Sequence, residues 1–156
     1  LALNEREKAI RLFKEIASRE GEEENVFAVE ATAKLVAISE NFEELKWARI
    51  RWTELEAEQD GWEQIGRRLI KRFNAMKKWD ESIEIGLKLK DVDGIDTETA
   101  KEMVIAAYRS GSPTMALHYL EQTNEGQIMN SRAPASADEF NEVVGQLESS
   151  PDRKRK

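Results

Sequence analysis

The sequence predicts an all-α fold in which short helices pair into antiparallel hairpins. Two observations predict it. Apolar residues recur at the spacing of an amphipathic helix over most of residues 4–124, with almost no strand alternation. Glycines and prolines fall between these periodic segments, where they act as breaks. The connections between the segments are only a few residues long, so neighbouring helices are expected to run antiparallel.

The sequence predicts seven such helices, followed by one more helix near the C-terminus. Asp96 or Thr97 is the predicted cap of the sixth helix, and Ser112–Pro113 begins the seventh, because proline suits the first position of a helix. The predicted boundaries of the first five helices are 4–19, 25–39, 42–58, 60–78 and 80–90.

The composition sets limits on function. The 156 residues carry 24 basic and 31 acidic side chains, for a net charge of −7, and this balance disfavours general binding to nucleic-acid phosphates. The absence of cysteine excludes disulfides, thiolate zinc sites and cysteine nucleophiles. No run of about 18 apolar residues is present, so no membrane span is predicted. We expect a cytoplasmic protein, although a chain without cysteine would suit the periplasm equally.

A small residue recurs at one position of the predicted hairpins. Ala48, Ser82 and Ala116 are spaced 34 residues apart. A small side chain lets two helices joined by a tight turn approach closely, and larger residues one turn later fill the gap. Each hairpin leaves one apolar face uncovered and therefore needs a neighbour. The sequence thus predicts a stack of hairpins.

The segment Lys101–Gly111, followed by Ala116–Leu120, resembles the tetratricopeptide repeat family: a first helix, a glycine turn and a second helix containing alanine. The resemblance covers about residues 4–123 and is clearest in the last two hairpins. It implies a right-handed stack of antiparallel hairpins, an α-solenoid of about seven helices plus a C-terminal helix. Ile70 and Val104 depart from the family pattern, which has a small residue there. Other α-hairpin repeats with looser periods remain open.

The C-terminal part divides further. We expect residues 1–123 to form the repeat domain, 124–135 a linker, 136–148 a helix and 149–156 a disordered basic tail. The helix begins with a capping box at Ser136–Glu139 and carries one apolar stripe. It is expected to cover the last hairpin; the alternative is a detachable helix that binds a partner or the groove of its own domain.

The residues give no pattern for catalysis. His118 is the only histidine and has no acidic or nucleophilic partner in a recognisable motif, so a surface role is expected. No glycine-rich phosphate loop, paired-carboxylate motif or metal-ligand spacing is present. We therefore expect a protein that is not an enzyme and needs no cofactor or metal.

One basic segment is a candidate binding surface. The predicted helix 60–78 has a local charge balance of +4 in a chain whose total is −7. In a tetratricopeptide-like stack the first helices of the hairpins line a concave groove, and basic and amide side chains there hold acidic peptides through charge-assisted hydrogen bonds. The alternative is that these charges pair with acidic neighbours at 54, 56 and 58. The peptide-binding residues that the resemblance implies are Arg67, Arg68, Lys71, Asn74, Lys101, Tyr108 and Arg109.

These observations predict a protein-interaction scaffold that binds a partner peptide, of acidic character, in its concave groove. The alternative is an oligomerisation or positioning module of a larger enzyme, such as one of the bacterial envelope or of polysaccharide metabolism, and stacked hairpins of this kind also form homo-oligomers. RNA binding by a helical repeat is the least favoured function because the chain is acidic. No membrane partner is expected.

Overall fold

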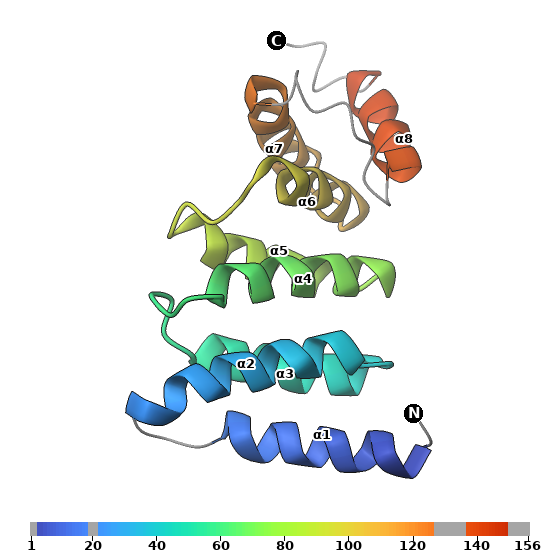
Figure 1. Cartoon of the computed structure of the whole chain (residues 1–156). Coiled ribbons are helices and arrows are strands. Elements are labelled where there is room, and N and C mark those ends of the chain that lie inside the picture. Colours follow the sequence, from blue (N-terminus) through green and yellow to red (C-terminus); the bar gives the residue numbers. More distant parts are fainter. Residues whose placement is uncertain (1–2, 19–21, 127–136, 150–156) are drawn as a thin grey trace. The chain divides into compact units, whose positions relative to one another are not determined.

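The computed structural model describes residues 3–18, 22–126 and 137–149, and these are all-helical, as the sequence predicted (Figure 1). Eight helices and no strand are present among the described residues. None of these helices is long and apolar enough to cross a lipid bilayer. The helices are α1 (Leu3–Ala17), α2 (Glu22–Ile38), α3 (Phe42–Glu54), α4 (Trp62–Ala75), α5 (Trp79–Lys90), α6 (Thr97–Arg109), α7 (Pro113–Gly126) and α8 (Ala137–Glu148).

The chain divides into two compact units, Leu1–Leu69 and Ile70–Lys156, and the division falls inside α4. A linker was expected at residues 124–135. Of that segment, residues 124–126 are the last turn of α7, and the rest lies outside the described residues. Ser136 of the predicted capping box and residues 150–156 of the predicted tail also lie outside them.

Local signals set the helix starts. Asn41 precedes α3, and its Oδ1 accepts a hydrogen bond from the backbone N–H of Glu44 at 2.9 Å. Asp96 precedes α6, and its Oδ1 accepts a hydrogen bond from the backbone N–H of Thr99 at 2.8 Å. Each carboxylate or amide oxygen satisfies an N–H that has no partner within the helix. Gly111, at φ +95°, reverses the chain between α6 and α7, a backbone conformation that favours glycine.

Two helices end earlier than their periodicity predicted. The third was expected to reach residue 58 but ends at Glu54, because Leu55 is extended (φ −75°, ψ 155°). The fourth was expected to reach residue 78 but ends at Ala75. Lys77 there adopts the left-handed conformation (φ 60°), and the N–H of Lys78 donates to the carbonyl of Phe73 at 2.9 Å.

The first unit is held by α1, α2 and α3, in which α2 packs against both of the others. Its centre contains two stacked indoles, Trp52 and Trp62, with ring centroids 4.4 Å apart. Each indole Nε1–H donates to the backbone carbonyl of the other residue, at 2.8 Å and 3.2 Å. This reciprocal pair fastens the end of α3 to the start of α4 and closes the loop between them.

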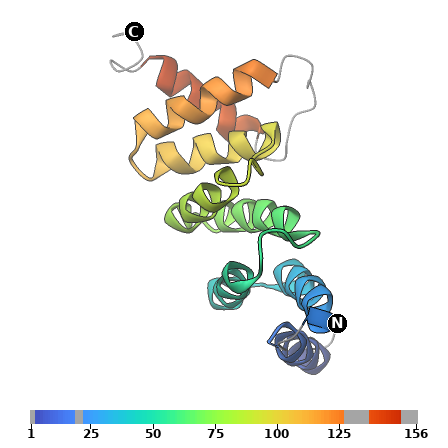
Figure 2. The ribbon, with the colours of Figure 1, turned by 90° about the vertical axis from the view of Figure 1, so that its left-hand side faces the viewer.

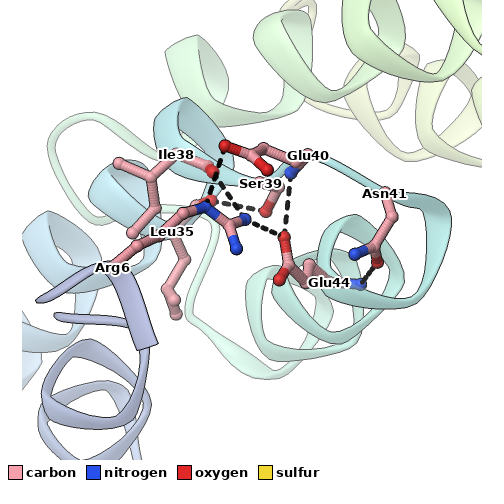
Figure 3. A network of polar contacts seen from close by, with 7 residues as sticks. All are labelled: Arg6, Leu35, Ile38, Ser39, Glu40, Asn41 and Glu44. Atoms are coloured by element: carbon pink, nitrogen blue, oxygen red, sulfur yellow. Dashed lines mark hydrogen bonds and ion pairs between the residues drawn. The ribbon is translucent and has the colours of Figure 1, made fainter. Parts of the chain in front are cut away.

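A polar network joins α1 to the turn between α2 and α3 (Figure 3). The Arg6 guanidinium donates to the carbonyl of Ile38 at 3.1 Å and pairs with the carboxylates of Glu40 (3.0 Å) and Glu44. Glu44 also accepts from the backbone N–H of Glu40 at 2.8 Å. The hydrogen bond from Arg6, more than any other contact, lowers the pKa of the Glu44 carboxyl below its usual range. The network therefore stabilises the attachment of α1.

The second unit is centred on α6, which packs against α5, α7 and α8. Figure 2 shows α6 and α7 side by side with α8 crossing against them. Close approach occurs at small residues. The fully buried Ser82 donates its hydroxyl to the carbonyl of Ile70 at 3.2 Å, and Gly86 of α5 lies directly against the side chain of Met103 on α6.

Gly86→Ala is expected to destabilise the chain by up to about 2 kcal/mol. An added Cβ would overlap Sδ and Cε of the fully buried Met103, and this overpacking outweighs the roughly 1 kcal/mol gained in helix propensity. Urea unfolding measures the difference. Gly145→Ala in α8 is the matched control, because its Cβ would meet nothing within 4 Å, and it should stabilise by about 0.5–1 kcal/mol. Equal effects at both sites would contradict the close approach of α5 and α6.

Glu44→Gln is expected to lower stability by about 1 kcal/mol near neutral pH. Because the pKa of Glu44 is lowered in the folded state, its contribution is present above the unfolded pKa of about 4.3 and is lost as pH falls through the folded value. The difference between the wild type and Glu44→Gln should therefore shrink as pH falls below about 5. Urea unfolding at several pH values measures it, with the exposed neighbour Glu43→Gln as control. A difference that stays constant down to about pH 2 would count against the Arg6–Glu44 contact.

Candidate functional site

The seven residues that the sequence singled out fall on two separate parts of the chain. Arg67 and Arg68 lie in the first unit, and the other five belong to the second. Arg67 is half-buried and pairs with Glu63 one turn earlier, at 3.3 Å. Arg68 is exposed and makes no ion pair with a described side chain; it borders a cleft between α2 and α4.

Lys71 and Asn74 share a cleft of about 340 Å³ in the second unit. Lys71 is 46% exposed, and its Nζ lies 2.6 Å from the carboxylate of Glu98 at the start of α6. That hydrogen bond raises the pKa of Lys71 above its ordinary value. The remaining residues around the cleft are Arg72, Ala75, Glu102, Ile105 and Glu139, so both signs of charge are present.

Asn74 is the buried polar group of this cleft, with 8% of its surface exposed. Its Nδ2 donates to the backbone carbonyl of Glu102 at 3.0 Å and so ties α4 to α6. Its Oδ1 is buried and has no hydrogen-bond partner among the described residues. An unpaired acceptor in such a place is costly.

Lys101 and Arg109 of α6 both contact α8. The Nζ of Lys101 lies 5.5 Å from the centre of the Phe140 ring, a cation–π contact. The guanidinium of Arg109 pairs with Glu139 at 3.2 Å and with Glu142 at 3.8 Å. We call this surface, defined by Lys101 and Arg109, the α6 face. It binds the acidic and aromatic side chains of a helix.

Tyr108 contacts its neighbour Arg109. Its half-buried ring lies 5.9 Å from the guanidinium carbon of Arg109. This contact helps to orient the arginine that pairs with the α8 carboxylates.

The only histidine, His118, is exposed, as expected from the sequence, and its Nε2 lies 3.3 Å from the Nζ of Lys90, which donates to it. Trp47 of α3 is half-buried, with the Nζ of Lys14 5.1 Å from its ring centre. Over residues 3–18, 22–126 and 137–149, no group of three histidine or carboxylate side chains is placed to hold a metal ion.

Sequence reasoning did not find the acidic partners of the basic residues. Glu98 lies 27 positions from Lys71, and Glu139 lies 30 positions from Arg109, so no local spacing connects them. The acidic neighbours proposed for the predicted helix 60–78, at positions 54, 56 and 58, are not the partners of Lys71, which pairs with Glu98. A usable signal was the helix of residues 137–148, which carries acidic residues beside its apolar stripe.

Comparisons with known proteins do not identify the chain: no family model matches it, and searches of curated proteins and of solved structures find no significant match. The functional argument therefore rests on the residues themselves.

Asn74→Asp is expected to destabilise the chain by about 2–4 kcal/mol. It replaces the donor that faces the Glu102 carbonyl with a second acceptor at a buried position. Urea unfolding gives the difference. Asn41→Asp is the matched control, because aspartate caps a helix as well as asparagine does, and its effect should stay within about 0.5 kcal/mol. Similar losses in the two variants would show that the Asn74 contact does not tie α4 to α6.

Proposed function

We propose that the chain is a protein-interaction scaffold without catalytic activity, and that its α6 face binds an acidic amphipathic helix of a partner protein. The packing of α8 carries the proposal. Lys101 and Arg109, two of the residues chosen from sequence for acidic-peptide binding, contact a helix that presents an aromatic ring and two carboxylates to them. A surface that holds such a helix within one chain has the chemistry to hold a similar helix of another.

The details of α8 define the partner. Val143 and Leu147 are fully buried, and Phe140 is half-buried, so the ligand helix needs apolar residues at spacings of three and four. Glu139 and Glu142 stand beside this stripe, one turn apart, and both pair with Arg109. A partner helix with a Glu-aromatic-x-Glu-aliphatic pattern would fit the same contacts.

The cleft beside the α6 face supplies a second point of recognition. Glu139 borders this cleft together with Lys71 and Asn74. The Oδ1 of Asn74 is closed to solvent, so an N–H of the partner would reach it only after the side chains around it move. Because buried polar atoms prefer to be paired, such a donor would favour the bound partner.

The arrangement proposed for the whole chain is a right-handed, tetratricopeptide-like stack of hairpins. The small residues at the 34-residue spacing support it: Ala48, Ser82 and Ala116 are each fully buried, as close helix packing requires. The glycine turn at Gly111 and the proline that begins α7 support it as well.

A synthetic peptide of residues 137–149 provides the probe. Binding of the labelled peptide to the full chain should be weak, because α8 competes from within the same molecule at an effective concentration in the millimolar range. Val143→Asp removes the buried anchor of α8 and should strengthen binding of the wild-type peptide by at least about tenfold. Fluorescence anisotropy measures both affinities, and circular dichroism verifies that the helices remain.

Arg109→Glu, added to Val143→Asp, should weaken peptide binding by at least about tenfold, because it places a carboxylate against Glu139 and Glu142. Arg11→Glu, an exposed change on α1, is the control and should change the affinity by less than about twofold. Rising salt should weaken binding to the chain with Arg109 intact. The proposal is wrong if Val143→Asp leaves peptide binding unchanged or if Arg109→Glu has no more effect than Arg11→Glu.

A further inference from the structure

The chain contains two Asp–Gly steps, and their backbones are held differently. Asp60–Gly61 lies between α3 and α4, and Asp93–Gly94 follows the end of α5. At such a step the peptide nitrogen of the glycine can attack the side-chain carboxyl of the aspartate, because glycine has no Cβ to hinder the approach. The attack requires a nitrogen that is free to move and to lose its proton. The hydrogen bonds of the two glycines therefore decide which step reacts.

The nitrogen of Gly94 is held by the end of α5. Its N–H donates to the carbonyl of Leu89 at 2.8 Å, and the N–H of Asp93 donates to the carbonyl of Lys90 at 3.1 Å. Asp93 is in the left-handed conformation (φ 54°), and Gly94 is buried. Bonds of this kind close the C-terminus of a helix. They must open before the Gly94 nitrogen can attack, so this step should react slowly in the folded chain.

The nitrogen of Gly61 is not held in this way. The N–H of Trp62 donates to the carbonyl of Gln59 at 3.1 Å, which closes a turn with Gly61 as its third residue at φ +92°. This positive φ is typical of a type II turn, whose closing bond does not use the N–H of the third residue. Among the described residues, the Gly61 N–H has no hydrogen-bond partner.

Water has access to the same step. Asp60 is exposed, and Gly61 is half-buried. Both residues border the cleft between α2 and α4, which has a volume of about 310 Å³. The carboxyl group of Asp60, the unbonded nitrogen of Gly61 and solvent therefore meet at one turn.

We propose that Asp60–Gly61 is a site of spontaneous isomerisation to isoaspartate in the folded chain, and that Asp93–Gly94 is protected. The nitrogen of Gly61 forms a bond to Cγ of Asp60. The carboxyl group loses its hydroxyl and the N–H loses its proton, and the two leave as water. One water molecule then opens the resulting five-membered succinimide ring. Opening at the side-chain carbonyl restores aspartate, and opening at the main-chain carbonyl gives isoaspartate, with no net change in mass.

The modification would act on the contact between α3 and α4. Isoaspartate adds one carbon to the main chain between the Cα of Asp60 and the nitrogen of Gly61. That carbon enters the turn whose closing bond is donated by Trp62, and Trp62 stacks on Trp52 with ring centroids 4.4 Å apart. The reaction therefore loosens the stacked pair. It involves only the first unit and is independent of the α6 face.

Peptide mapping of the full chain, incubated at physiological temperature and neutral pH, tests the proposal. Trypsin places the two steps in separate peptides, 52–67 and 91–101. Chromatography separates each isoaspartyl peptide from the native peptide of equal mass, and an isoaspartyl methyltransferase labels only the former. Isoaspartate should form at position 60 at least about fivefold faster than at position 93, the factor expected if one net hydrogen bond must first break. Circular dichroism verifies that the incubated chain remains folded.

The same measurement in denaturing urea separates structure from sequence. Neither turn persists there, so the two rates should agree within about twofold. Asp60→Asn and Asp93→Asn are a matched pair in which ammonia leaves in place of water and each reaction shows as a gain in mass. Their rates in the folded chain should again differ by at least about fivefold.

Asp60→Glu is the control for the consequence, because its longer side chain cannot form the five-membered ring. The incubated wild type should unfold at lower urea than fresh protein, and incubated Asp60→Glu should not change. Equal rates at the two steps of the folded chain, or a faster rate at position 93, overturn the proposal. An unchanged unfolding midpoint in a chain that contains isoaspartate at position 60 overturns the effect on the stacked pair.

Discussion

Close contact between helix backbones is the constraint on which the rest of this structure depends. Helices of 12 to 17 residues have little stability of their own and must gain it from their neighbours. In the second unit this requires Ser82 against the carbonyl of Ile70 and Gly86 against Met103. Larger residues at those points would push α5 away from α4 and α6. The position of α6, and with it the orientation of Lys101 and Arg109, follows from these contacts.

Charge placement follows a different rule from apolar packing. The basic side chains of the second unit that the sequence singled out do not stand free: Lys71 is paired with Glu98, and Arg109 with two carboxylates of α8. A partner that binds there exchanges one set of ion pairs for another. Such an exchange contributes little affinity by itself but discriminates well between partners, because a partner without matching carboxylates leaves the arginine without its ion pairs.

The helices were largely predictable from the sequence, and the site was predictable only in part. Periodicity and caps located the helices because both are local, and Asp96 caps α6 as expected. The early end of α3 was not predictable from its pattern, because it depends on the pairing of Trp52 with Trp62, a contact that forms only in the folded chain. Likewise, the resemblance to tetratricopeptide repeats made Arg109 a candidate, but its partners on α8 are 30 and more positions away. The exposure of Val26 and Phe27 could not be predicted either, since an apolar pair in a helix is normally interpreted as part of the core.

The stacked indoles have a consequence for observing the molecule. Trp47, Trp52 and Trp62 all belong to the first unit, whereas the second contains Trp79 and both tyrosines, Tyr108 and Tyr119. Two indoles 4.4 Å apart are electronically coupled, so the ultraviolet circular dichroism of the first unit carries a signature that the second, with one tryptophan, cannot produce. The chain therefore contains a natural optical label for each half. Loss of order in one unit can be followed separately from the other without adding a dye or changing a residue.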